Sequence, residues 1–176
     1  MSTITTVPTG TWTLDPVHSK AGFAVRHSGI ATFRGHFSEL SAQLEEGTLT
    51  GAVDVSSVEV PVAQLKGHLL APDFFDAEQF PQITFTASEL SVEGEQLSLR
   101  GELTMKGVTQ PLEAKGSLAG PATYLDGSER IAISLETIVN RHDFGVSWNA
   151  DLPTGGKAVG DDVTLTVDLY LVKAEA

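Results

Sequence analysis

Apolar and polar residues alternate along most of this chain, which is the pattern of β-strands with one dry and one wet face. Ala21, Phe23, Val25 and His27 share one face of the first long run, and residues 97–105 alternate just as regularly. We expect roughly eight to ten strands, joined mostly by short turns that contain glycine. Two-faced strands favour an antiparallel meander over a parallel sheet that is buried on both faces.

The alternation stops in residues 68–85, HLLAPDFFDAEQFPQITF. A helical spacing of Val62, Leu65 and Leu69 leads into this segment and ends at Pro72, and three of the eight phenylalanines follow within seven residues. Large rings on an irregular segment need burial, and the inside of the surrounding sheet offers the apolar volume. We therefore predict an all-β fold: an extended antiparallel β-barrel of about eight strands, with one short helix and a Phe-rich insertion across one end. A barrel of about eight strands is just wide enough to hold one small ligand.

The composition narrows the classes of partner. The length of 176 residues suits one domain, and we expect a flexible Ser/Thr-rich lead-in over residues 1–10 followed by the barrel over residues 11–174. Asp+Glu 23 against Lys+Arg 11 gives a formal net charge of -12, which disfavours nucleic acids and anionic membrane surfaces. Cysteine is absent, so disulfides and thiolate chemistry are excluded. No stretch resembles a signal peptide or a membrane span, so we expect a cytoplasmic protein without stable membrane insertion.

Several segments, taken together and in this order, resemble the YceI-like family of lipid-binding proteins. They are WTLDPVHSKAGFAVRH (12–27), FRGHF (33–37), HLLAPDFFDAEQFPQITFTAS (68–88), GELTMKGVTQPL (101–112), NRHDFGV (140–146) and VGDDVTLTVDL (159–169). The resemblance implies a lipocalin-like barrel with an internal channel for a polyisoprenoid or another long amphiphile. Many members of the family are periplasmic or secreted.

The residues expected to face such a channel are mostly aromatic or aliphatic and lie at inward positions. Phe74, Phe75 and Phe85 lead this prediction, although rings of this kind could equally plug a closed end of the barrel. Small inward residues favour a cavity because they remove the side chains that would fill it; they are Gly35, Ala87, Gly101, Ala114 and Gly116. The complete predicted set of ligand-binding residues is Phe23, Val25, His27, Phe33, Phe37, Phe74, Phe75, Phe85, Leu99, Leu103, Phe144, Trp148 and Arg141.

The five histidines have no pair at the spacing of a metal site on a helix or a strand, so no metal is expected. Alternation puts His27 on the inward face, where an unpaired imidazole would cost several kcal/mol. The favoured interpretation is a core histidine that is hydrogen-bonded to the backbone. The alternatives are a polar contact to a ligand head group and a general base in an enzyme.

Two further groups of residues have a chemical and a structural interpretation. His18 and Ser19 suggest a base and a nucleophile, but Ser19 is outside any G-x-S-x-G elbow. We favour a turn in which Asp15 accepts hydrogen bonds from backbone N–H groups around Pro16. For Arg141 we favour an ion pair with a carboxylate, and the alternative is a clamp for a phosphate or carboxylate head group.

These observations favour a non-enzymatic protein that stores or carries one long-chain amphiphile, with no cofactor apart from the bound lipid. Affinity would come from hydrocarbon burial at about 0.8 kcal/mol per CH₂ group. The resemblance favours a polyisoprenoid such as a polyprenyl phosphate or a quinone, and a fatty acid or amide stays open. The alternatives are a lipid-modifying enzyme with His27 as acid or base, and an interaction domain with a filled barrel. A homodimer is also possible.

Overall fold

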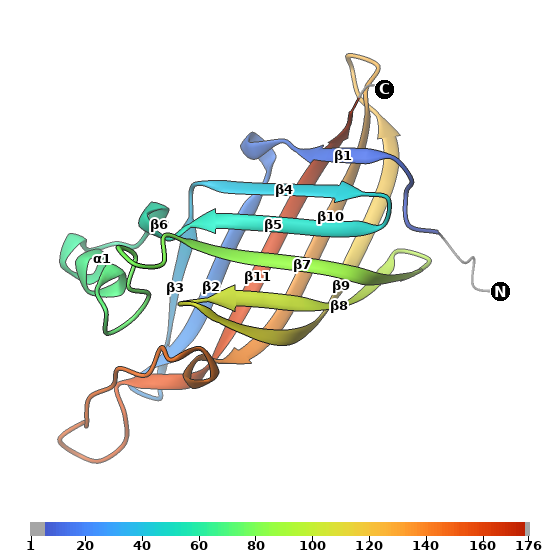
Figure 1. The fold of residues 1–176 in the computed structure, drawn as a ribbon. Helices are drawn as coiled ribbons and strands as arrows, with labels where there is room; N and C mark the ends of the chain where they lie inside the picture. Colours follow the sequence, from blue (N-terminus) through green and yellow to red (C-terminus); the bar gives the residue numbers. More distant parts are fainter. Residues whose placement is uncertain (1–5, 175–176) are drawn as a thin grey trace.

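The computed structural model describes residues 6–174, and its backbone pairing closes eight antiparallel strands into a barrel (Figure 1). The ring closes because β1 pairs with β4 on one edge and with β11 on the other, where Leu14 lies opposite Leu171. In order around the barrel the strands are β1 (Thr11–Leu14), β4 (Leu40–Glu45), β5 (Thr48–Asp54), β7 (Gln82–Glu93), β8 (Gln96–Met105), β9 (Val108–Thr123), β10 (Glu129–Asn140) and β11 (Val159–Lys173). The predicted all-β antiparallel barrel is therefore confirmed.

Three more strands extend the sheet beyond this ring. They are β2 (Lys20–His27), β3 (Ala31–Phe37) and β6 (Val58–Glu59). The long strand β11 pairs with β1 near its C-terminal end and with β2 over its first part, and β3 and β6 follow β2. One edge of β11 thus pairs with β1 at one end and with β2 at the other, so the sheet divides into two branches along this edge. Short 3₁₀ turns lie at Pro16–His18, Val55–Ser57 and Arg141–Phe144.

The one α-helix, α1 (Ala63–Leu70), lies with the following Phe-rich segment at one end of the barrel (Figure 1). Its N-terminus has no side-chain cap, and an isolated helix of eight residues is unstable in water. Packing therefore holds it, through the buried side chains of Leu69 and Phe74. After Pro72 the chain turns repeatedly, and the N–H of Phe80 donates to the carbonyl of Asp76 at 2.8 Å. The predicted helix and insertion are both present. None of the helices within residues 6–174 is long and apolar enough to cross a bilayer.

The opposite end of the barrel is filled by side chains. Trp12 lies at its centre, 1% exposed, and its indole Nε1 donates to the carbonyl of Thr9 at 3.0 Å. Around it pack Leu44, Leu49, Leu97, Leu118, Ile131, Ile133 and Leu171, all of them less than 2% exposed. Of the predicted flexible lead-in, residues 1–5 lie outside the described residues, and Val7 packs against this core. The mobility of the lead-in stays a prediction.

The sequence suggested that the small inward residues leave space for a cavity, but most of them do not. A Cβ on Gly101 or Gly116 would overlap the backbone of the neighbouring strand, so these two glycines allow close strand approach. At Gly35 an added Cβ would lie 2.5 Å from the ring of Phe23, which packs across the glycine. Ala87 belongs to the filled end. Only Ala114 of the predicted group lies on a cavity wall.

Candidate functional site

A cavity with a volume of about 480 Å³ lies at the α1 end of the sheet. Strands β2, β3 and β11 form its wall, while α1, the Phe-rich segment and residues 141–159 cover it. Almost all of the surrounding surface is apolar. Ligand pockets in proteins measure about 300–1,000 Å³, so this cavity is large enough for part of a lipid-sized molecule.

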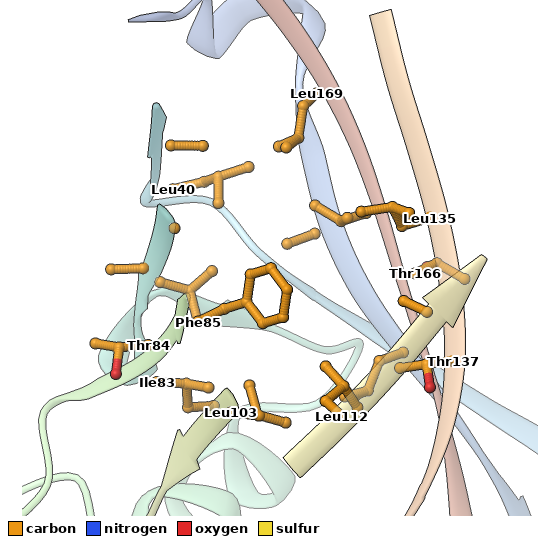
Figure 2. Close-up of a pocket in the computed structure, with 18 of the residues that line it drawn as sticks. Leu40, Ile83, Thr84, Phe85, Leu103, Leu112, Leu135, Thr137, Thr166 and Leu169 are labelled. Carbon is orange, nitrogen blue, oxygen red and sulfur yellow. The ribbon is translucent and has the colours of Figure 1, made fainter. Parts of the chain in front are cut away.

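A second cavity of about 160 Å³ lies in the middle of the barrel. Figure 2 shows the ring of Phe85 extending into it, with Leu40, Leu103 and Leu135 around it. Both cavities are lined by Phe37, Ile83, Met105 and Leu165, so the two cavities are adjacent. Together they form an apolar hollow that runs from the middle of the barrel to its α1 end.

Most of the predicted site residues line this hollow. The larger cavity is bordered by Phe23, Val25, His27, Phe33, Phe37, Phe74, Phe75, Arg141 and Trp148, and the smaller one by Phe37, Phe85 and Leu103. Leu99 and Phe144 are exceptions, because both are buried in the packed core and neither lines either cavity. Leu99 lies near the filled end, and Phe144 turns into the core from a 3₁₀ turn. Ligand contact stays a prediction for all of the predicted site residues.

The sequence interpretation missed other residues of the larger cavity wall. Val163 and Leu165 of β11 and Val139 of β10 were available from the same alternation. In contrast, Val146 and Ala158 come from irregular chain, where no period indicates the direction of a side chain. Neither residue could have been found from the pattern.

Three rings close the α1 end of the cavity. The His68 ring of α1 stacks edge-on against Phe74, with centroids 4.8 Å apart, and against Trp148 at 4.7 Å. Phe74 and Trp148 also contact each other, with centroids at 5.5 Å. This aromatic cluster joins the helix, the Phe-rich segment and the loop after β10 into one cover over the cavity.

Comparison with known proteins places this architecture in a family. A family model described as YceI-like domain matches residues 12–171. The chain belongs to the YceI-like family. A UPF0312 protein of Staphylococcus aureus (strain MSSA476) is 29% identical over an alignment of 163 residues, and the alignment covers 86% of this chain and 91% of that protein.

Two solved structures extend the YceI-like comparison. The Campylobacter jejuni YCEI protein superposes with a TM-score of 0.71 at 26% identity, covering 85% of this chain and 90% of that one. A polyisoprenoid binding domain from Saccharophagus degradans superposes with a TM-score of 0.74 at 16% identity, covering 93% and 98%. The second likeness is one of fold alone.

In this YceI-like barrel Arg141 is buried, with 4% of its surface exposed, and it bonds to backbone carbonyls. Its Nε donates to Gly160 at 2.7 Å, its Nη1 to Val146 and Trp148 at 2.8 Å each, and its Nη2 to Val159 at 3.4 Å. No carboxylate within residues 6–174 forms an ion pair with it, so the predicted pair is wrong. Burial lowers the pKa of Arg141, and Asp161 partly opposes this effect. With four of its five N–H groups used, the guanidinium mainly fixes the chain that covers the cavity.

His27 is the last residue of β2 and lies exposed at the rim of the larger cavity. Its ring has no hydrogen-bond partner among the side chains and backbone groups of residues 6–174. The favoured interpretation of a buried, backbone-bonded histidine is therefore wrong. The physical reason is position: alternation gave the correct face, but the strand ends where the sheet meets solvent.

The segment around His18 and Ser19 forms the predicted turn. Asp15 Oδ1 accepts the N–H of Val17 at 2.9 Å, and the hydroxyl of Ser19 donates to the Asp15 carbonyl at 2.7 Å. The Ser19 oxygen also accepts the N–H of Tyr170 at 2.9 Å. His18 Nδ1 lies 3.1 Å from Asp15 Oδ2, so both side chains of the suspected base and nucleophile are part of a structural turn.

The substitution Asp15→Ala is expected to lower the free energy of unfolding by about 1 kcal/mol at neutral pH, because it removes a helix-type cap. The hydrogen bond from His18 and that from Val17 lower the pKa of Asp15, while burial raises it. A lowered pKa stabilises the fold above the unfolded value of about 3.9 and loses this effect as the pH falls below it. Urea unfolding at a series of pH values should therefore show the variant and the wild type converging below about pH 4. Asp151→Ala, which breaks an exposed pair with Lys157, should change nothing measurable; equal losses in both variants would contradict the prediction.

Lys106, in the turn between β8 and β9, ties the cover of the cavity together. Its Nζ donates to the carbonyl of Pro72 at 2.7 Å and to that of Gly145 at 3.1 Å. Pro72 belongs to the Phe-rich segment and Gly145 to the loop after β10. One ammonium group therefore connects both covering segments.

The substitution Lys106→Met keeps the length of the side chain and removes both hydrogen bonds. We expect severalfold faster hydrogen exchange in residues 71–80 and 142–148, with a loss of global stability near 1 kcal/mol. Hydrogen-exchange mass spectrometry measures the local effect. Lys115→Met, at an exposed position of β9, is the matched control and should leave both segments unchanged. Equal exchange in wild type and Lys106→Met would show that the ammonium does not hold the cover.

Proposed function

We propose that this protein binds one long-chain amphiphilic lipid, of polyisoprenoid or isoprenoid-quinone type, inside the barrel and stores or carries it. The observation that carries this proposal is the apolar hollow between the filled end and the cover. Membership of the YceI-like family supports it. So does the fold shared with a Saccharophagus degradans domain that is described as polyisoprenoid binding.

The cavity wall favours recognition of a chain over recognition of a head group. Each buried CH₂ group contributes about 0.8 kcal/mol, and the wall supplies few polar partners that are free. Arg141 uses most of its donors on carbonyls, which weakens the head-group clamp considered from the sequence. The polar end of the ligand would therefore lie at the rim, near His27, and selection among chains of similar length would be loose.

Native mass spectrometry of the protein as first purified tests this proposal. We expect a bound mass that disappears on denaturation and is recovered in an organic extract as a long-chain amphiphile. Empty protein should take up a polyprenyl phosphate or a ubiquinone in a fluorescence-quenching titration, because Trp148 lies on the cavity wall. Protein that is repeatedly empty and takes up neither probe would refute the proposal.

The two other functions considered from the sequence have less support. A general base usually has a partner that orients it, and His27 has no carboxylate within ion-pair distance in the described chain. A His27→Gln variant that still binds lipid but no longer converts it would favour an enzyme. An interaction domain would need no internal space, and this barrel has an apolar hollow.

A further inference from the structure

The hairpin formed by β2 and β3, residues 20–37, combines a cavity wall with an exposed apolar tip. Its inward side chains, among them Phe23, Val25 and Phe33, line the larger cavity. At the tip the N–H of Ile30 donates to the His27 carbonyl at 3.2 Å, and Ile30 itself is 84% exposed. In Figure 1 the tip reaches the end of the barrel where the loop after β10 lies, and the N–H of Ser28 donates to Ala158 of that loop at 2.8 Å. The exposed isoleucine therefore lies beside the cavity.

The same hairpin is a basic region on an acidic protein. Residues 16–38 contain no Asp or Glu, although the chain has 23 of them, and they include Lys20, Arg26 and Arg34. Arg26 lies opposite Thr32, and Ala24 lies opposite Arg34, so the two arginines share one face of the hairpin close to the tip. Arg26 also borders the rim of the larger cavity. Within the described part of the chain neither arginine has a carboxylate within ion-pair distance. Arg26 donates to the hydroxyl of Thr32 at 3.3 Å and to the carbonyl of Gly29 at 3.2 Å. These acceptors are neutral, so the positive charges of both arginines stay unpaired and can attract an external anion.

Carboxylates near the tip reduce this local charge without cancelling it. Asp151 pairs with Lys157, and Asp161 pairs with His142 at 2.7 Å. Asp162, at the start of β11, is exposed and has no ion-pair partner among residues 6–174. Any attraction of the hairpin to an anionic surface is therefore moderate and sensitive to salt.

We propose that the β2–β3 hairpin docks on an anionic lipid surface, with Ile30 entering the interface and Arg26 and Arg34 facing the phosphate groups. A bilayer interface presents anionic groups at its surface and hydrocarbon below them. The hairpin has the matching arrangement, because Ile30 is at its tip and the two arginines lie farther from the tip. An acidic protein surface matches the cations but offers no apolar layer to Ile30. The inference rests on the proposed function, because docking would bring the cavity next to the lipid that supplies or receives its cargo.

Vesicle co-sedimentation of the full chain tests the docking. We expect binding to vesicles of phosphatidylcholine with phosphatidylglycerol, little binding to phosphatidylcholine alone, and release as salt shortens the Debye length from about 10 Å at 0.1 M to about 3 Å at 1 M. Equal binding to both kinds of vesicle, or no binding to either at low salt, would overturn the proposal. So would salt-sensitive self-association in size-exclusion chromatography without vesicle binding, because the hairpin would then fit a second copy.

Substitutions separate docking from cargo binding. Ile30→Ser and Arg34→Glu should each weaken vesicle binding about tenfold or more. Two matched controls should leave vesicle binding unchanged. They are Leu125→Ser, at a residue that is 94% exposed in the hairpin tip at the filled end, and Lys115→Glu on β9. All four variants should take up a soluble prenyl probe like wild type. Unchanged vesicle binding by Ile30→Ser and Arg34→Glu refutes the docking surface, whereas vesicle binding by a protein that takes up no probe refutes the proposed function alone.

Discussion

The substitution Val25→Trp is expected to weaken lipid uptake at least tenfold, a loss of about 1.4 kcal/mol of binding free energy, while stability stays nearly unchanged. Val25 lies on the wall of the larger cavity and opposite Val163 of β11, whose side chain lines the same space. An indole there would occupy volume that the ligand needs. Titration with a prenyl or quinone probe measures uptake, and urea unfolding measures stability.

Two control substitutions make this result specific. Ile138→Trp adds the same ring to β10 at a residue that is 63% exposed, so uptake should be normal. Leu97→Phe overfills the packed end, where Leu97 is 1% exposed, and should cost about 1–3 kcal/mol of stability. Normal uptake by Val25→Trp would mean that the ligand does not enter this cavity, and a loss of stability like that of Leu97→Phe would mean that the space is not empty.

The substitution Arg141→Met is expected to lower the free energy of unfolding by about 3–4 kcal/mol, because it leaves buried carbonyl groups without donors. The guanidinium bonds to Val146, Trp148, Val159 and Gly160, which lie on both sides of the loop that covers the cavity. Arg141→Lys should recover only part of the loss, since one ammonium cannot reach donors spread over a planar fork. Urea unfolding with a constant m-value gives the measurement.

A surface arginine provides the comparison for Arg141. Arg100 pairs with Glu113 at 2.9 Å, and both side chains are more than 60% exposed. Arg100→Met should therefore cost less than about 1 kcal/mol. If Arg141→Met costs no more than Arg100→Met, the carbonyl bonds do not hold the loop, and the cover must be stabilised by its aromatic contacts alone.

Alternation predicted the strands and most of the cavity wall because a period of two determines which face each side chain takes. It placed Phe23, Val25 and Phe37 correctly, and the break at Pro72 indicated the covering segment. The period does not say how far along a barrel a residue lies, so Leu99 was assigned to the hollow although it lies near the filled end. His27 shows the same limit at the other end of a strand.

The local sequence pattern could not predict contacts between distant parts of the chain. The charge of Arg141 suggested an anionic partner, but its partners are carbonyl oxygens, which every residue has. The division of β11 between β1 and β2 has no local signal either, since both parts of the strand alternate alike. The sequence shows that residues 16–38 lack Asp and Glu, but it does not show that the hairpin within them borders the cavity.

The packed end around Trp12 acts as a fixed floor for whatever enters the hollow. If the proposed lipid binds and its tail reaches this floor, each additional isoprene unit can only push the opposite end of the molecule outward. Tail length would then set how far the head group protrudes from the rim, so a short cargo would be hidden and a long one presented to whatever collects it.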